Sequence, residues 1–230
     1  MGKNLGGYRF RSGSTMNEAR IICASAPHLL AFNGKIYNPM DLRRELQGHG
    51  VPGWRGHSDT ETLLAGFGAW GIEKMLGKCV GMFAFAAWDA QERVLTLGRD
   101  RLGEKPLYYG WQGTGEDAAF IFGSELKALQ AHPAFDAPVC RHALALYMRH
   151  SHVPAPYSIR QGIAKLLPGH VLKISLQDRT PRLQAYWSGT AVLERGLAQP
   201  FARTPAQAVD ALDALLRETN AAQLGAQVPL

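Results

Sequence analysis

The stretch VGMFAFAAWD, residues 80–89, is apolar or small on both of its alternating faces. One face carries Val80, Met82 and Ala84, and the other carries Phe83, Phe85 and Ala87. Successive side chains of a strand point to opposite sides of a sheet, so this composition predicts a strand covered on both sides. The stretch RVLTLGRD, residues 93–100, follows a short polar turn and predicts the second strand of a hairpin.

Strand and helix signals alternate along the chain on both sides of this hairpin. Further strands are predicted at 19–25, 28–34, 106–111, 118–124, 169–174 and 182–187. Helices are predicted at 41–46, 59–70, directly after Ser124, and at 139–149. Ser58 and Glu61 match a capping box before the helix at 59–70. Apolar strands in hairpins with helices between them predict a layered α+β domain rather than a parallel doubly wound sheet.

The composition changes after Trp187, where Gly, Pro and Arg appear without periodicity up to about residue 203. This change predicts an irregular linker. A helix is expected next, with Thr204 as its N-cap, Pro205 in its first turn and Gln207 completing a capping box. Its apolar stripe consists of Val209, Leu212, Leu215 and Leu216. The stripe is expected to dock either on the first domain or on protein beyond residue 230.

Composition excludes several classes of protein. Of the 230 residues, 46% are hydrophobic and 19% are charged, which excludes a disordered chain. The net charge is +6, but residues 1–55 alone carry +5 and no basic run is interleaved with aromatic residues. We therefore expect no nucleic-acid partner. No apolar run is long enough for a membrane span or a signal peptide, which predicts a cytoplasmic protein without a membrane partner. Cys23, Cys79 and Cys140 form no CxxC pair, so they predict buried structural thiols and no metal site.

Three segments carry a family resemblance: AFNGKIYN (31–38), WRGHSDTETLL (54–64) and RDRLGEKPLYYG (99–110). They resemble the glutamine-hydrolysing domain of glutamine-dependent asparagine synthetase, a class II amidotransferase of the N-terminal-nucleophile type. FGSELKAL (122–129), PGHVLKI (168–174) and the Tyr186–Trp187 pair follow in matching order. The resemblance implies a four-layer αββα sandwich of antiparallel sheets that lacks its first strand region and carries an added C-terminal helix.

The same resemblance predicts the organisation of the chain, which we expect to be truncated at both ends. Residues 1–28 form an atypical N-terminal segment that does not resemble the start of the family. Residues 29–187 form the amidotransferase domain and residues 188–203 the linker. Residues 204–230 form the first helix of an ATP-dependent synthetase domain that lies outside this chain.

The resemblance assigns catalytic and glutamine-binding roles to Asn33, Gly34 and Asp59. Asn33 would offer its side-chain NH₂ and Gly34 its backbone N–H to the oxyanion formed during amide hydrolysis. An ordinary Asn-Gly hairpin turn is the alternative for these two residues. In the family, the aspartate that matches Asp59 binds the α-ammonium group of glutamine. The alternative for Asp59 is stabilisation of a helix N-terminus.

The sequence also departs from the family pattern. Such enzymes use an N-terminal cysteine whose own α-amine activates the thiol, whereas this chain begins with Met1 and Gly2. Cys23 could serve only after cleavage at Ile22. Lys35 stands where the family has glutamate, and its repulsion of a substrate ammonium at 4 Å is on the order of 4 kcal/mol before screening. We expect weak glutamine binding and little or no glutaminase activity in the chain as given.

The charged loop at 99–105 leaves two interpretations open. Its charged residues are Arg99, Asp100, Arg101, Glu104 and Lys105. They predict a salt-bridged surface turn. The alternative suggested by the resemblance is a packing role at the interface with a second domain.

In the complete family enzyme, glutamine is hydrolysed in this domain and the ammonia amidates aspartate at a second site. ATP and magnesium act in that absent synthetase domain, so we expect no cofactor and no metal in these 230 residues. A second copy of the chain is a further candidate partner. The alternatives are a non-catalytic dimerisation or binding module with the same fold, and another class II amidotransferase.

Overall fold

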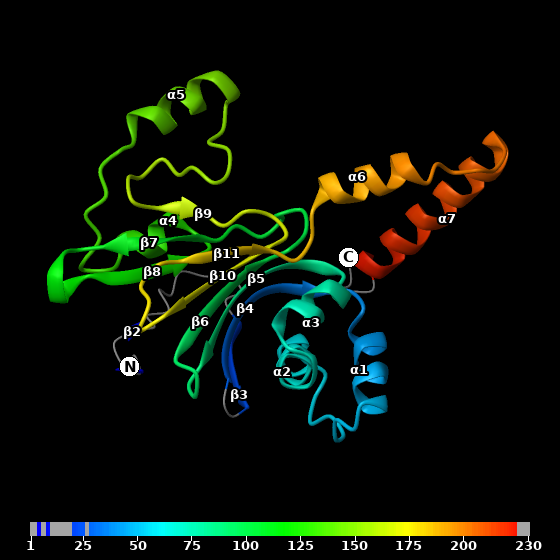
Figure 1. Ribbon diagram of the computed structural model, residues 1–230, viewed down its shortest axis with the longest axis horizontal. Helices are drawn as coiled ribbons and strands as arrows, with labels where there is room; N and C mark the ends of the chain where they lie inside the picture. The colour runs from blue at the N-terminus through cyan, green and yellow to red at the C-terminus, as the bar shows by residue number, and fades with distance from the viewer. Residues whose placement is uncertain (1–3, 6–7, 10–19, 26–27, 225–230) are drawn as a thin grey trace. The chain divides into compact units, whose positions relative to one another are not determined.

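The computed structural model describes residues 4–5, 8–9, 20–25 and 28–224 (Figure 1). Contacts divide the chain into two units. The first consists of residues 1–34 and 82–184, and the second of residues 35–81 and 185–230. Strands β4 (His28–Ile36) and β5 (Gly81–Asp89) each begin in one unit and end in the other, so the chain passes from one unit to the other within these two strands.

The strands form two main antiparallel sheets. The six-stranded sheet has the order β11-β10-β6-β5-β4-β3, and its strands are β3 (Arg20–Ser25), β4 (His28–Ile36), β5 (Gly81–Asp89), β6 (Val94–Arg99), β10 (His170–Ser175) and β11 (Arg182–Ala185). The three-stranded sheet has the order β8-β7-β9, with β7 (Tyr108–Gln112), β8 (Ala119–Gly123) and β9 (Ala164–Lys165). The short strands β1 (Asn4–Leu5) and β2 (Tyr8–Arg9) pair with each other. The predicted hairpin is confirmed, since β5 pairs antiparallel with β6.

The core of the first unit lies between the two sheets. The six-stranded sheet contributes Ala84, Ala86, Trp88, Leu95, Leu97, Leu172 and Ile174, which form one buried cluster with Leu107, Tyr109, Phe120 and Leu166. Helix α4 (Leu126–Gln130) follows β8, and its Leu129 packs with Ile121 in a second cluster (Figure 1). Burial on both faces of β5 follows from its alternating apolar pattern, as predicted. Helix α5 (Arg141–His150) begins two residues after the start of the segment predicted at 139–149 and ends one residue after its end.

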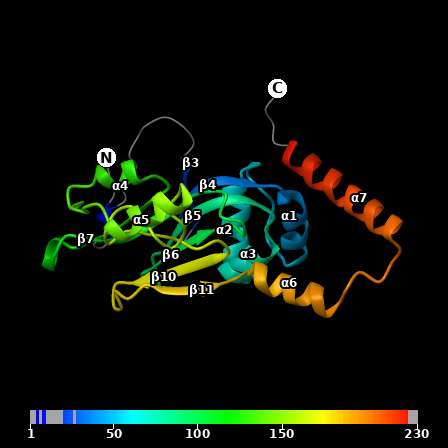
Figure 2. The same cartoon turned by 90° about the horizontal axis from the view of Figure 1, so that it is seen from above.

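Within the second unit, the stretch 35–81 contains the helices α1 (Pro39–Gly48), α2 (Asp59–Trp70) and α3 (Ile72–Lys78), and α2 packs against both α1 and α3 (Figure 2). The prediction for α2 is confirmed at both ends, and the Ser58 side chain accepts a hydrogen bond from the Glu61 N–H at 3.3 Å. Gly66 allows α2 and α3 to approach closely, because a Cβ there would lie 2.3 Å from Met75 Sδ. The apolar face of α1, formed by Leu42 and Leu46, is buried as predicted.

Two helices end the described chain, α6 (Gly189–Ala198) and α7 (Pro205–Leu224). The expectation of an irregular segment is wrong for residues 189–198. Ser188, which accepts from the Ala191 N–H at 3.4 Å, caps α6 and is a local helix signal within a composition that otherwise suggested a linker. The Thr204–Gln207 capping box of α7 is confirmed in both directions, at 3.3 and 3.2 Å. No helix among the described residues is long and apolar enough to cross a membrane.

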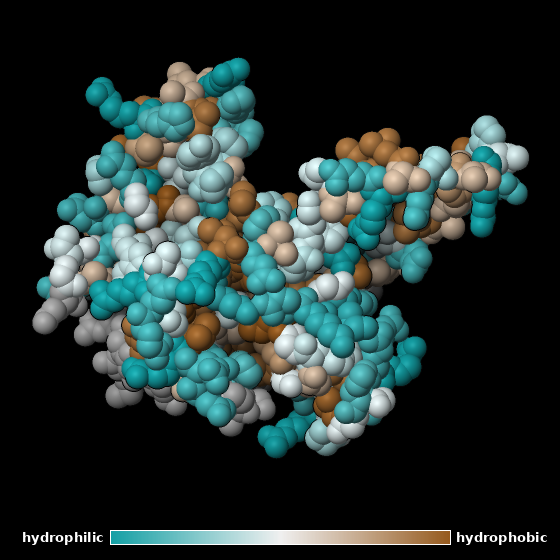
Figure 3. Space-filling view, viewed as in Figure 1, coloured by the Kyte–Doolittle hydropathy of each residue, from teal (hydrophilic) through white to brown (hydrophobic). Residues whose placement is uncertain are grey.

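Apolar side chains on α6 and α7 are exposed, and brown residues appear on both helices in Figure 3. On α7 they are the predicted stripe residues, exposed by 67% (Val209), 56% (Leu212), 59% (Leu215) and 53% (Leu216). On α6 they are Val192, Leu193 and Leu197. The stripe of α7 is therefore exposed in the part of the chain that the structure describes, and its docking stays a prediction.

Candidate functional site

Asn33 and Gly34 lie inside strand β4, so the alternative of an ordinary hairpin turn is wrong. Gly34 has a φ of +148°, a conformation that favours glycine. A Cβ at this position would lie 2.1 Å from the Met82 carbonyl oxygen and 2.6 Å from Phe83 Cα. Both atoms belong to the backbone of β5, so they cannot move aside as the end of a flexible side chain can. Glycine is therefore required where the two strands approach each other.

The side chain of Asn33 is held by a residue from the other sheet. Its Nδ2 donates to Ser124 Oγ at 3.0 Å, and Ser124 lies directly after β8. An amide NH₂ has two donors, so this bond orients the group while its second N–H stays available for a substrate oxygen. Ser124 was missed as a site residue in the sequence, although it belongs to the matched segment at 122–129.

Asp59 is the first residue of α2, but it is not the helix cap, because Ser58 performs that role. Its side chain is 10% exposed. Asp59 Oδ2 accepts a hydrogen bond from the Ile36 backbone N–H at 2.9 Å. The carboxylate thus holds the end of β4 two residues after Gly34.

Lys35 meets the same carboxylate oxygen. Its Nζ lies 3.8 Å from Asp59 Oδ2, and its side chain is 38% exposed. Both residues belong to the second unit. The sequence predicted that Lys35 would repel a substrate ammonium, and the structure adds that Lys35 already contacts the residue expected to bind this ammonium.

The expected surface turn at 99–105 is wrong for its first two residues, which are buried. Asp100 is 1% exposed. Its carboxylate accepts hydrogen bonds from the backbone N–H groups of Phe83 (3.2 Å), Leu102 (3.1 Å), Glu104 (2.9 Å) and Lys105 (3.0 Å). Backbone donors from β5 and from its own loop compensate for the burial of this charge.

The guanidinium of Arg99 donates to backbone carbonyl oxygens, whereas the Asp100 carboxylate accepts from backbone N–H groups. It is 9% exposed and donates to the carbonyl oxygens of Gly103 (2.6 Å), Lys105 (2.8 Å) and Leu166 (2.6 Å). Burial lowers the pKa of Arg99, and the nearby charge of Asp100 opposes this shift. Arg99 and Asp100 together fix the loop that joins the two sheets. Their partners are backbone groups, so the amino-acid composition of the loop does not predict these contacts.

The three cysteines differ in their surroundings. Cys79 is 1% exposed, so the prediction of a buried thiol is confirmed there. Cys140 is only half-buried, at the N-cap of α5, and for it the prediction is wrong. Cys23 lies in β3 opposite Leu30, and its side chain lies outside the described residues.

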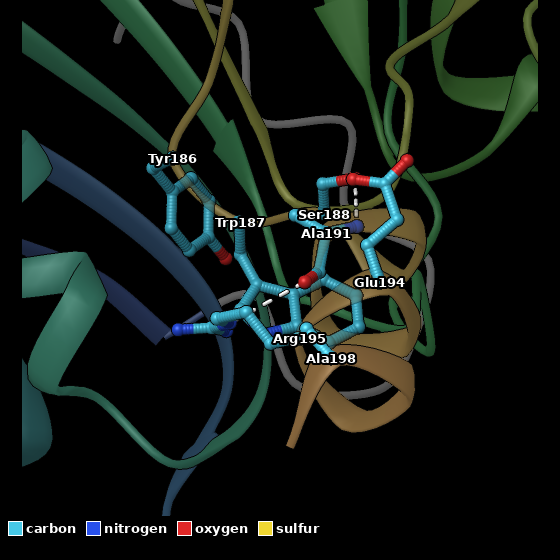
Figure 4. Close-up of a pocket in the computed structure, with 7 residues that line it drawn as sticks. All are labelled: Tyr186, Trp187, Ser188, Ala191, Glu194, Arg195 and Ala198. Atoms are coloured by element: carbon cyan, nitrogen blue, oxygen red, sulfur yellow. Dashed lines mark hydrogen bonds between the residues drawn. The ribbon is translucent and has the colours of Figure 1, made fainter. Parts of the chain in front are cut away.

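A hollow of about 550 Å³ lies at the start of α6 (Figure 4). Its lining residues are Tyr186, Trp187, Ser188, Ala191, Glu194, Arg195 and Ala198. In Figure 4 the Ser188 and Arg195 side chains both bond to Ala191, to its N–H at 3.4 Å and its carbonyl oxygen at 3.3 Å. The hollow is thus formed by the turn into one helix, and none of the predicted site residues lines it.

The fold is similar to that of a solved amidotransferase. The structure of glutamine phosphoribosylpyrophosphate amidotransferase from Bacillus subtilis superposes with a TM-score of 0.50 at 19% identity. The match covers 74% of this chain and 31% of that one. At this identity the likeness concerns the fold alone, and it confirms the predicted α+β sandwich of two antiparallel sheets with helices.

Residues 19–187 match the family model described as a glutamine amidotransferase domain, and the chain belongs to this family. The match begins at residue 19 and includes β3, so it starts inside the segment 1–28 that was expected to be atypical. The family membership agrees with the resemblance stated from the sequence.

Curated relatives of the chain within this family are named as asparagine synthetases. Asparagine synthetase [glutamine-hydrolyzing] 3 of Bacillus subtilis is 40% identical over 163 residues, which cover 70% of this chain and 25% of the relative. A putative asparagine synthetase of Mycobacterium tuberculosis is 33% identical over 202 residues, covering 87% of this chain and 30% of the relative. The chain therefore spans about a quarter to a third of the length of these relatives. Their names do not favour a non-catalytic module.

Proposed function

We propose that this chain acts as the glutamine-hydrolysing domain of an asparagine synthetase. The observation that carries the proposal is the geometry at Asn33 and Gly34. A steric contact with β5 requires glycine at position 34, and Ser124 orients the amide beside it. Two donors in neighbouring residues of a half-buried strand suit an oxyanion better than they suit a structural turn.

In the proposed reaction, a nucleophile attacks the side-chain amide carbon of glutamine and the carbonyl oxygen becomes negatively charged. The second N–H of Asn33 and the N–H of Gly34 stabilise that oxygen until the C–N bond breaks and the nitrogen, which takes up the proton lost by the nucleophile, leaves as ammonia. Water then hydrolyses the bond between the nucleophile and the acyl group, which releases glutamate. The resemblance assigns Asp59 to the amino-acid end of glutamine. No residue is assigned as the nucleophile, since the resemblance gives that role to an N-terminal cysteine.

The destination of the ammonia is a further part of the proposal. The names of the curated relatives support asparagine as the final product. Aspartate would be the acceptor, and ATP with magnesium would activate it in a domain outside these 230 residues. A homodimer of the chain is proposed on the resemblance alone.

The oxyanion assignment is tested by ammonia release from glutamine in the wild type, Asn33→Ala and Asn220→Ala. Loss of one oxyanion donor is expected to lower the rate by about 10²–10³-fold. Asn220→Ala is the matched control, because Asn220 is exposed on α7. Equal rates for the two variants would overturn the assignment of Asn33.

If the wild type turns glutamine over too slowly to follow, glutamine binding is measured instead. Saturation-transfer NMR with glutamine is expected to detect binding, at the least in a Lys35→Glu variant that restores the acid of the family pattern. Absence of binding in both proteins would overturn the proposed function.

A further inference from the structure

Arg43 is a buried arginine of α1 that bonds to the chain on both sides of Asp59. It is 5% exposed. Its Nη1 donates to the Gly56 carbonyl oxygen at 2.7 Å, and its Nη2 donates to the Ser58 carbonyl oxygen at 3.0 Å. Its Nε donates to Thr62 Oγ1 at 2.7 Å. A buried cation is costly without partners, so these bonds compensate for its loss of solvation.

Glu61 holds the same loop through its N–H groups. Its carboxylate accepts from the N–H groups of Arg55 (2.7 Å) and Gly56 (3.0 Å). The carboxylate also lies 3.5 Å from Arg43 Nη2, so the two charges that hold the loop are paired with each other. The Arg43 guanidinium lies over the Trp54 ring, 4.5 Å from its centroid. The backbone that leads into α2 is therefore held at both its N–H and its carbonyl groups.

Asp59 directly follows the carbonyl group that Arg43 binds. Its side chain is nearly buried, and its Oδ2 accepts from the Ile36 N–H at 2.9 Å. Its other oxygen, Oδ1, has no hydrogen-bond partner in the part of the chain that the structure describes, so it is left for a ligand. All of these groups belong to the stretch 35–81 of the second unit, so their relative placement does not involve the first unit.

We propose that Arg43 is a positioning residue for Asp59, because it fixes the backbone from which the carboxylate meets the α-ammonium of glutamine. This inference rests on the proposed function, in which the resemblance assigns Asp59 to that end of glutamine. Two nitrogens of one guanidinium bind two different carbonyl oxygens at once. Lysine keeps the charge but has a single nitrogen, so it does not reproduce this geometry. Arg43 therefore governs the affinity for glutamine rather than the chemical step.

The first measurement needs no ligand. In a ¹H–¹⁵N NMR spectrum of the full chain, the Ile36 N–H resonance reports the carboxylate that accepts from it. Asp59→Ala gives the position of this resonance without the acceptor. Arg43→Lys and Arg43→Met are expected to move the resonance toward that position, because the carboxylate shifts with its backbone.

Arg44→Met is the matched control. Arg44 follows Arg43 on α1 and carries the same charge, but it is exposed and pairs with Asp41 at 3.2 Å on the same helix. Its loss should leave the Ile36 resonance in place. An equal shift in Arg44→Met would overturn the inference, since the loss of any arginine of α1 would then have the same effect.

The second measurement is the affinity for glutamine, determined by calorimetry in the wild type and in the Lys35→Glu background. Arg43→Lys is expected to lower the affinity about tenfold, since a displaced carboxylate makes a poorer charged hydrogen bond to the ammonium. Arg44→Met should keep the affinity within about twofold, because exposed ion pairs contribute little.

The outcomes separate positioning from stability. A purely structural role of Arg43 lowers the free energy of unfolding but leaves the Ile36 resonance and the glutamine affinity of the folded protein unchanged, and this result would overturn the inference. Arg43→Lys provides the measurement if Arg43→Met does not fold. Failure of both the wild type and Lys35→Glu to bind glutamine would overturn the proposed function instead, and the Ile36 resonance would still decide whether Arg43 positions Asp59.

Discussion

Gly34 is the residue whose backbone most restricts the candidate site. Its φ of +148° and its closeness to the Met82 carbonyl leave no room for a side chain. We expect Gly34→Ala to lower the free energy of unfolding by about 2 kcal/mol or more, since β4 and β5 must separate to accommodate a methyl group. Urea denaturation measures this change.

The control for this prediction is Gly68→Ala in α2. A Cβ at Gly68 meets nothing within 4 Å, and the residue is exposed. Alanine is favoured over glycine in a helix by up to about 1 kcal/mol, so this variant should be slightly more stable than the wild type. Similar stability of the two variants would contradict the steric interpretation of Gly34.

Asp100 shows how a single buried charge organises a loop. Its carboxylate accepts hydrogen bonds from the backbone N–H groups of four residues. In Asp100→Asn an NH₂ group replaces one accepting oxygen and faces N–H donors. We expect a loss of about 2–4 kcal/mol in the free energy of unfolding. Glu104→Gln at an exposed position of the same loop should change it by less than about 0.5 kcal/mol, and an equal loss in both variants would contradict this role of Asp100.

Strand β7 contributes a titratable side chain to the core between the sheets. Tyr109 is 9% exposed and contacts Phe120 at a ring distance of 6.0 Å. Burial raises the pKa of Tyr109, because the phenolate is poorly solvated in the core. The neutral form is therefore the one that the folded state favours.

The sign of the pH dependence follows from this shift. Because the folded pKa of Tyr109 lies above the unfolded value of about 10, its stabilising contribution is complete below about pH 10 and is lost as the pH rises further. Tyr109→Phe should show a shallower loss of stability above pH 10 than the wild type in urea denaturation. Tyr147→Phe, at a half-exposed position on α5, should follow the wild-type curve, and identical slopes in all three proteins would contradict the prediction.

Local sequence signals suffice to predict helix α2 but not helix α6. α2 combines an N-cap with an apolar periodicity, and its predicted bounds are confirmed. Its Glu61 departs from the capping box in one respect, because its carboxylate accepts from the N–H groups of Arg55 (2.7 Å) and Gly56 (3.0 Å). α6 has a cap but no buried residue, so the absence of a clear apolar period concealed it.

At the scale of the whole molecule, the stripe of α7 has no packing partner among the described residues. Leu215, which is 59% exposed, gives the test. Leu215→Gln should change the free energy of unfolding by less than about 0.5 kcal/mol, because little apolar area leaves water at this position. Leu63→Gln, at a fully buried position of α2, should cost about 3 kcal/mol or more in the same urea titration. A loss above about 1 kcal/mol for Leu215→Gln would show that the stripe docks within this chain.

The sequence alone predicted the strands β3 to β8, β10 and β11 and the helices α2 and α7, and through the family resemblance it pointed to the candidate residues Asn33, Gly34 and Asp59. Alternation, caps and short motifs are properties of neighbouring residues, so they can be read without knowing what packs against them. Only the tertiary structure showed that Asp100 is buried and that Lys35 contacts Asp59. It also revealed why Gly34 must be glycine. These features depend on groups distant in the sequence, because the burial of a charge and the room for a methyl group are decided by the backbone that folds against them.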